Sequence, residues 1–246
     1  MGQIVPHRGL ALLDLTLPTL AENLALDEAL LLEAEDRTGS EILRFWEWPN
    51  PSVVLGAGGK LAEDVVEDSC LRDAIPIQRR SSGGGTVLLG RGCQLFSLIL
   101  RFDRDPALKD VNASYRFIMG RLIHALRPIA EVEHSGISDL AVAGRKIAGN
   151  AQQRKRDHVL HHGTLLYSFD LDLIPRYLRM PKKQPGYREG REHESFVTNL
   201  PADAATLKQA LSAEWQAEVR PIELPRQRIT ELLKDKYESE EWIRRR

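Results

Sequence analysis

The spacing of apolar residues predicts a buried helix near the start of the chain. Leu20, Leu24 and Leu31 follow Pro18-Thr19 at intervals that place them on one helix face. This helix is expected to end before Gly39. The same periodicity predicts further helices over 61–71, from an N-cap at Ser114 to about 126, over 204–217 and from 227 to the end of the chain.

Shorter runs rich in β-branched and aromatic residues lie between these helices. They predict strands over 42–48, 52–55, 75–78, 86–89, 94–102, 139–142, 146–149 and 159–167. The strands before and after Ala143-Gly144 are expected to form a hairpin. Because strand meanders are interspersed with helices and no regular strand–helix repeat occurs, the pattern favours an α+β fold with a mixed sheet over a doubly wound sheet.

The segment 182–194 combines lysine, arginine, proline and glycine with almost no apolar residue. This composition predicts an exposed, mobile loop. The chain contains no internal repeat and no linker between two large domains, so the pattern indicates a single domain over 1–246. Its last part, from about 220 to 246, is expected to be a helical appendage.

Composition argues against several classes of function. The chain has 246 residues and a formal charge of -1, which removes the bulk electrostatic argument for nucleic-acid binding. No run approaches the roughly twenty apolar residues of a membrane span, and the first residues do not follow a leader pattern. Two cysteines, Cys70 and Cys93, make neither a disulfide framework nor a zinc site. We expect a cytoplasmic protein with no nucleic-acid or membrane partner and no metal site built from protein side chains alone.

The first stretch with candidate chemistry is Arg79-Arg80-Ser81-Ser82-Gly83-Gly84-Gly85. Glycines let a ligand approach the main chain, and guanidinium groups beside exposed N–H groups can hold a carboxylate or another anion. The alternative is a flexible turn with two solvated arginines.

A second stretch, 144–152, places Lys146 on a predicted strand between glycines and ahead of the amides Asn150 and Gln152. A lysine there could point into a cleft and hold a phosphate or the carbonyl oxygen of an activated acyl group. The alternative is an ordinary surface lysine of a hairpin.

A third stretch, His161-His162-Gly163-Thr164, begins a predicted strand with small residues after its histidines. Small residues there suit packing beside a ligand. The alternative is a buried histidine with a purely structural role.

In this order and spacing, the three stretches resemble the linked motifs of the lipoate–protein ligase A family over about 10–215. The resemblance implies the biotin/lipoyl ligase catalytic fold, with an acyl tunnel opening near the glycine loop and no C-terminal accessory domain. It implies attachment of lipoate or octanoate, through an acyl-adenylate made from ATP with Mg²⁺, to a lysine of a lipoyl-domain acceptor. Acceptors would be of the 2-oxoacid dehydrogenase E2 or glycine cleavage H-protein type, and a separate accessory polypeptide could assist.

The resemblance also assigns residue roles. Lys146 is implied to be the catalytic residue that contacts the acyl carbonyl and the phosphate. The implied substrate-binding residues are Arg79, Arg80, Ser82, Gly83, Gly84, Gly85, Asp139, Gly149, Asn150, Ala151, His162, Gly163 and Thr164.

Two departures from the family pattern bear on the reaction. Leu89-Gly90-Arg91-Gly92-Cys93 replaces a His-Asp-x-Gly-Asn stretch, which weakens the transfer of nucleotide contacts to this chain. Related octanoyltransferases place a nucleophilic cysteine shortly before the lysine motif, whereas 135–139 has none, which favours the ligase. Cys93 is the other candidate nucleophile, against the alternative of a small buried thiol. An octanoyltransferase that uses an acyl-carrier-protein thioester and a non-catalytic lipoate-binding protein remain alternative functions.

Overall fold

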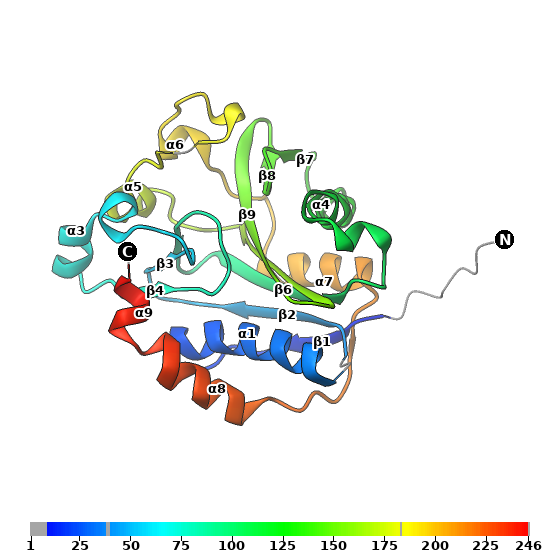
Figure 1. Cartoon of the computed structure of the whole chain (residues 1–246). Coiled ribbons are helices and arrows are strands. Elements are labelled where there is room, and N and C mark those ends of the chain that lie inside the picture. The colour runs from blue at the N-terminus through cyan, green and yellow to red at the C-terminus, as the bar shows by residue number, and fades with distance from the viewer. Residues whose placement is uncertain (1–8, 38–39, 183, 246) are drawn as a thin grey trace.

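Two β-sheets form the framework of the protein in the computed structural model, which describes residues 9–37, 40–182 and 184–245 (Figure 1). The larger sheet has the order β11-β1-β2-β6-β10-β9-β8-β7, and it is mixed because β1 runs parallel to both of its neighbours. Its strands are β1 (Ala11–Asp14), β2 (Ile42–Glu47), β6 (Cys93–Arg101), β7 (Val132–Ser135), β8 (Asp139–Val142), β9 (Arg145–Arg154), β10 (His158–Leu166) and β11 (Glu218–Val219). The smaller sheet has the order β4-β3-β5 and contains β3 (Ser52–Leu55), β4 (Ile77–Arg79) and β5 (Val87–Leu89).

Helices cover both faces of the larger sheet. Helices α1 (Leu20–Arg37) and α8 (Arg226–Leu232) lie on one face, and α4 (Val111–Leu126) and α7 (Ala204–Glu214) lie on the other (Figure 1). Successive side chains of a strand point to opposite faces, so β2 contributes to two apolar cores. The shorter helical elements are α2 (Leu61–Asp64), α3 (Glu67–Arg72), η1 (Pro106–Lys109), α5 (Leu173–Tyr177), η2 (Gly186–Arg188), α6 (His193–Phe196), η3 (Leu233–Tyr237) and α9 (Glu240–Arg244).

Polar residues interrupt the apolar surface of α1 because they bind a buried arginine. The guanidinium of Arg44 on β2 donates to Asp27 Oδ1 at 2.6 Å and to Asn23 Oδ1 at 2.7 Å. Ser97 Oγ on β6 donates to the second oxygen of Asp27 at 2.8 Å. A buried charge is tolerated when it is paired and hydrogen-bonded. This network fixes α1 on the sheet whose strands β9 and β10 carry the candidate site.

The predicted α+β fold, a mixed sheet with flanking helices, is confirmed. The hairpin about Ala143-Gly144 is also confirmed, with both residues at positive φ, 49° and 68°. The short strands β1, β7 and β11 escape prediction because they have only two to four residues. In addition, β1 and β11 depend on partners distant in sequence, whereas β7 pairs with its neighbour β8. Of the helices that the structure describes, none has the length and apolar content needed to span a bilayer.

Two predicted helix boundaries are wrong. Asp110, and not Ser114, caps α4, because its side chain accepts a hydrogen bond from the Ala113 N–H at 2.7 Å. The helix expected over 61–71 divides into α2 and α3. Val65 between them is extended and forms a β-bridge with Leu178, which a continuous helix would not allow.

The helix expected from 227 onward is broken as well. Helix α8 is followed by the π-helical turn η3, and Ser239 caps α9. Together 226–245 pack on α1 and on β4, where α9 lies beside the smaller sheet (Figure 1). Residues 1–8 of the expected domain, Gly39 and the final residue of the expected helix lie outside the described residues.

The expectation of an exposed loop over 182–194 is wrong in part, because exposed residues of this segment alternate with buried ones. Arg188 and His193 are buried, and the Tyr187 ring lies 5.1 Å from the ring of Phe196. Arg191 Nη2 donates to the Gly144 carbonyl at 2.9 Å, which ties the segment to the turn between β8 and β9. These contacts join residues far apart in sequence, so local composition did not indicate them.

Candidate functional site

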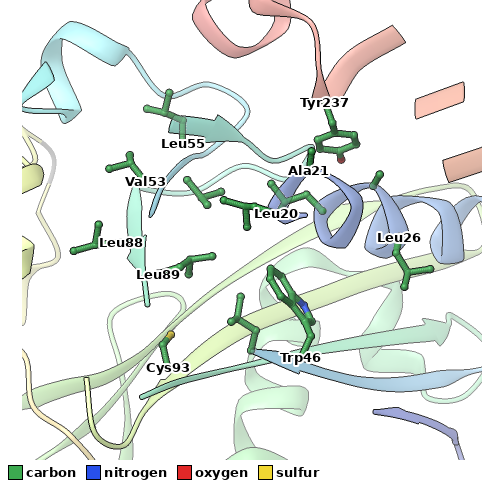
Figure 2. Close-up of a cluster of buried hydrophobic side chains, with 14 of the residues drawn as sticks. Leu20, Ala21, Leu26, Trp46, Val53, Leu55, Leu88, Leu89, Cys93 and Tyr237 are labelled. Carbon is green, nitrogen blue, oxygen red and sulfur yellow. The ribbon is translucent and has the colours of Figure 1, made fainter. Parts of the chain in front are cut away.

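An apolar cavity of about 640 Å³ lies between α1, the smaller sheet and strands β9 and β10. Figure 2 shows Trp46 and Leu89 in the cluster of buried side chains below α1. A concave, mainly hydrocarbon wall suits an extended saturated chain. Apolar lining residues include Leu24, Trp46, Val54, Leu89, Leu95 and Phe169.

Lys146 and Asp139 form a polar part of the lining. A register shift between Leu140 and Ala141 sets Lys146 opposite Ala141, and its Nζ lies 2.7 Å from Asp139 Oδ1. A Cβ on Gly149 would stand 3.0 Å from this Nζ, so the glycine gives the lysine side chain room to cross the strand. The Lys146 side chain is 29% exposed, which leaves the ammonium accessible from the cavity.

The second oxygen of Asp139 is held by Tyr187, a residue that sequence reasoning missed. Tyr187 Oη donates to Asp139 Oδ2 at 2.9 Å. Burial, together with the charge of Asp139, raises the pKa of Tyr187 well above its ordinary value, so the phenol stays a donor. Asp139 therefore accepts from two sides, and its orientation toward Lys146 is fixed.

Further basic groups surround this polar region. Arg179, Arg188 and His193 also line the cavity. Arg179 Nε donates to the Val65 carbonyl at 3.0 Å, and the Arg188 guanidinium lies 4.5 Å from the centre of the Phe196 ring. Burial lowers the pKa of His193, so the positive charge comes from the two guanidinium groups, which suit a carboxylate, a phosphate or a developing oxyanion. In the sequence, Tyr187 only precedes Arg188, and nothing there indicates that its partner is Asp139.

The two arginines of the glycine stretch brace the loop itself. Arg80 donates to the carbonyls of Val54, Gly83 and Gly85 at 3.3, 2.6 and 2.8 Å. Its Nε donates to Ser82 Oγ at 3.0 Å, and burial lowers the pKa of Arg80 to about 10. Its guanidinium lines the cavity but is occupied mainly with its own loop.

Arg79 lies outside the cavity lining, which corrects its expected role at the acyl and phosphate region. Its guanidinium is buried and donates to the carbonyls of Gly56, Gly59 and Ile243 at 2.9, 2.7 and 3.0 Å. It therefore joins the glycine loop to the neighbouring turn and to the C-terminal segment.

Gly84 is required by the path of the loop. It has φ of 87°, a conformation that side chains with a Cβ rarely adopt, and a Cβ would lie 3.0 Å from Arg80 Nη2. The backbone at Gly56 approaches the loop more closely still, because a Cβ on Gly56 would lie 2.1 Å from the Gly84 carbonyl oxygen. Gly85 lines the cavity beside it, whereas Gly83 and Ser82 do not.

His162 connects β10 to the glycine loop. Its Nε2 lies 2.6 Å from Ser82 Oγ, and burial, reinforced by the charge of Arg80, lowers the pKa of His162 to about 3. Arg80 Nε also donates to Ser82 Oγ, so the serine hydroxyl connects the arginine with this neutral ring. The expected ligand-binding histidine thus also supports the loop.

Asn150 and Gly163 lie opposite each other on β9 and β10. The backbone N–H and the side-chain Nδ2 of Asn150 both donate to the Ser138 carbonyl, at 3.0 and 2.9 Å. A Cβ on Gly163 would stand 2.1 Å from Asn150 Oδ1. Asn150 therefore anchors the chain immediately before Asp139, and Gly163 gives it space.

The structure brings together most of the predicted site residues. Those that line the cavity are Arg80, Gly84, Gly85, Asp139, Lys146, Gly149, Asn150, Ala151, His162, Gly163 and Thr164. Arg79, Ser82, Gly83 and Cys93 lie outside its lining.

Neither cysteine is placed to act as a nucleophile. Cys93 is buried in the apolar cluster of Figure 2, where burial first, and then Glu47, raises the pKa of its thiol to about 12. Cys70 on α3 is also buried, and burial raises its pKa. A thiol needs its thiolate form to attack an acyl group. The described residues contain no group of three or more His, Cys, Asp or Glu side chains suited to a metal ion.

The mixed sheet borders a hydrocarbon-lined cavity with a lysine in its polar part. Residues 19–217 match the lipoyl protein ligase A/B catalytic domain, and the chain belongs to this family.

Several individual proteins are similar to this chain. An octanoyltransferase LipM of Carboxydothermus hydrogenoformans is 30% identical over 261 residues, covering 91% of this chain and 94% of the relative. A LipM of Geobacillus kaustophilus is 26% identical, covering 90% and 93%. A structure of a bi-partite lipoate protein ligase and its E2 lipoyl domain from Thermoplasma acidophilum matches with a TM-score of 0.81 and 25% identity, covering 97% of both chains.

Proposed function

We propose that this chain attaches an octanoyl or lipoyl group to a lysine of a lipoyl-domain acceptor protein. The observation that carries the proposal is the continuity of one cavity from an apolar wall to Lys146. Burial of each methylene of an acyl tail contributes about 0.8 kcal/mol. The tail would lie along Leu24 and Trp46 and bring its carbonyl to the ammonium.

The chain's own groups suggest how the acyl group reacts. The amine of the acceptor lysine attacks the acyl carbonyl, a C–N bond forms, and the leaving group departs with the electron pair of the broken bond. The amine gives up a proton in the same reaction, and the departing anion or the solvent takes it up. Lys146 would stabilise the negative charge that develops on the carbonyl oxygen, and Asp139, held by Tyr187, would position that ammonium.

The names of the curated relatives, which are octanoyltransferases, support transfer of an octanoyl group. The donor of this first candidate would be an octanoyl thioester of an acyl carrier protein. The burial of Cys93 and Cys70 away from the cavity lining supports direct transfer from donor to acceptor, with no acyl-enzyme on cysteine. This first candidate is therefore an octanoyltransferase that works without a thiol nucleophile.

A second candidate is an ATP-dependent ligase that works through an acyl-adenylate. It is supported by the basic groups Arg179 and Arg188, which line the same cavity as Lys146 and suit a phosphate, and by the likeness to a bi-partite lipoate protein ligase. ATP would enter as a substrate with Mg²⁺, and a separate accessory polypeptide could be needed for activation of the free acid.

The donor decides between the candidates. The full chain is incubated with a lipoyl-domain acceptor and one of three donors: octanoyl-acyl carrier protein, lipoate with ATP and Mg²⁺, or synthetic lipoyl-adenylate. Acylation of the acceptor is followed by intact mass. Product from the thioester alone supports the transferase, whereas product from the adenylate, with or without product from ATP, supports the ligase. If no donor gives product, the proposal is wrong, and lipoate binding in calorimetry would then indicate a non-catalytic binding protein.

A further inference from the structure

The C-terminal segment 226–245 contacts the glycine loop from outside the cavity. Helix α9 and β4 exchange hydrogen bonds in both directions: Trp242 Nε1 donates to the Arg79 carbonyl at 3.0 Å, and Arg79 Nε donates to the Ile243 carbonyl at 3.0 Å. The same guanidinium holds the carbonyls of Gly56 and Gly59. Since Gly56 is in close contact with Gly84, the C-terminal helix is linked to the loop through one arginine.

A second connection runs through a buried carboxylate. Tyr237 Oη donates to Glu28 Oε2 at 2.7 Å, and Lys236 Nζ lies 2.8 Å from both oxygens of Glu28. Gln153 Nε2 donates to Glu28 Oε1 at 3.1 Å, and its other side-chain atom accepts from Ser81 Oγ at 2.5 Å. The chain Tyr237–Glu28–Gln153–Ser81 thus crosses from η3 through α1 and β9 to the glycine loop.

Burial makes the hydrogen bonds of Glu28 and Tyr237 important for stability. Tyr237 and Glu28 are buried, and Figure 2 shows the Tyr237 ring against Ala21 of α1. A buried carboxylate left without its donors is strongly unfavourable. The ammonium of Lys236 also lies 4.4 Å from the centre of the Trp242 ring, so the two connections share a residue. Neither Tyr237, Lys236 nor Trp242 lines the cavity.

We infer that the C-terminal segment positions the glycine loop for acyl binding, with Tyr237 and Trp242 as positioning residues. Hydrogen bonds within the loop do not alone fix its conformation. Arg79 is held by α9, and Ser81 is held through β9 and α1 by η3. The inference rests on the proposed function in taking the acyl group as the ligand of this loop.

Two variants remove one hydrogen bond each and keep the ring. Tyr237→Phe removes the donor to Glu28, and Trp242→Phe removes the donor to the Arg79 carbonyl. Tyr177→Phe is the matched control, because Tyr177 is also buried and donates to a carboxylate, Asp73, at 3.0 Å. The Asp73 carboxylate also pairs with Arg72 and Arg176, which are not part of the glycine loop. All three are compared with the wild type in unfolding stability, amide hydrogen exchange of 80–86, lipoate affinity and transfer kinetics.

We expect Tyr237→Phe and Trp242→Phe to weaken lipoate affinity and raise the KM for the acyl donor by about tenfold, as loss of a hydrogen bond to a charged or buried partner does. The kcat at saturating donor should change less than twofold, and exchange of 80–86 should increase. Tyr177→Phe should lower the unfolding stability but leave both the KM for the acyl donor and kcat close to wild type.

Unchanged affinity and unchanged exchange of 80–86 in both test variants would overturn the inference. If Tyr237→Phe does not fold, Trp242→Phe decides. Amide hydrogen exchange tests the link between the C-terminal segment and the glycine loop without turnover or ligand. It therefore separates this inference from the proposed function. If the wild type neither binds lipoate nor transfers an acyl group while exchange of 80–86 still responds to the tail variants, the proposed function fails and the structural link stands.

Discussion

Lys146 Nζ lies 2.7 Å from Asp139 Oδ1, and this pair sits where the apolar cavity becomes polar. The two residues come from adjacent strands joined by a tight hairpin, so their geometry is set locally. Tyr187, 48 residues after Asp139, completes the arrangement by donating to the other carboxylate oxygen. The position of the Lys146 ammonium therefore depends on Asp139 of the same hairpin and on Tyr187 of a distant segment.

Replacement of Lys146 by methionine should lower the rate of acyl transfer by at least about 10², with little effect on folding. Removing one donor to a developing oxyanion lowers rates by about 10²–10³. Lys208→Met is the control, since Lys208 also pairs with an aspartate, Asp14, at 2.9 Å and has a similarly exposed side chain, but does not line the cavity. Acceptor acylation and thermal unfolding are measured for both. A Lys146→Met enzyme that turns over within a few fold of wild type would remove the assigned role.

Replacement of Tyr187 by phenylalanine should lower kcat by about tenfold, which is the lower range for a hydrogen bond to a charged group. The ring contact with Phe196 is kept, so the segment should stay in place while Asp139 loses one donor. The rate of acceptor acylation at saturating donor measures the effect. An unchanged kcat would show that Lys146 alone orients Asp139.

Replacement of Gly84 by valine should prevent acyl binding. The substitution meets two obstacles: a φ of 87° and a Cβ position 3.0 Å from Arg80 Nη2. Gly120→Ala is the control, because a Cβ there meets nothing within 4 Å and alanine favours the helix. Calorimetry with lipoate compares the two. Wild-type affinity in Gly84→Val would mean that the loop is an ordinary turn.

The sequence indicated the local parts of this site and missed the non-local ones. The Lys146 hairpin could be predicted because Ala143-Gly144 is a turn dipeptide between two strands, and the glycine loop because Gly84 needs positive φ. Whether an arginine binds a ligand or the protein's own carbonyls depends on what lies opposite it. Arg79 meets Ile243, 164 residues away, and no local pattern encodes such a contact.

Stability should decrease as the pH falls below about 6.5. Burial lowers the pKa of both His161 and His162 to about 3 from 6.5, so the unfolded chain takes up protons on these rings that the folded protein excludes. Above the unfolded pKa both states are neutral and these groups add nothing. Between the two pKa values each ring contributes a slope of up to about 1.4 kcal/mol per pH unit. Urea unfolding from pH 7 to pH 4 should show a shallower slope for His162→Gln than for the wild type, and equal slopes would contradict the assignment.

Replacement of Cys93 by serine tests whether any thiol takes part in the reaction. Cys93 lies outside the cavity lining, and burial raises the pKa of its thiol to about 12, so the thiolate is essentially absent at neutral pH. We expect Cys93→Ser to keep most of its activity with whichever donor the wild type uses, and to lose about 1 kcal/mol of stability from altered packing. Cys70→Ser serves as the control for a second buried thiol, on α3.

Intact mass after exposure to octanoyl-acyl carrier protein, without acceptor, should show no acyl adduct on the wild type or on either variant. Serine is too weakly activated to replace a nucleophilic cysteine. A loss of at least about 10³ in rate for Cys93→Ser alone, together with an octanoyl thioester trapped on Cys93 of the wild type, would establish a covalent route. Such a result would require the cluster around Cys93 to open during turnover, because the donor cannot reach a thiol that is packed among apolar side chains.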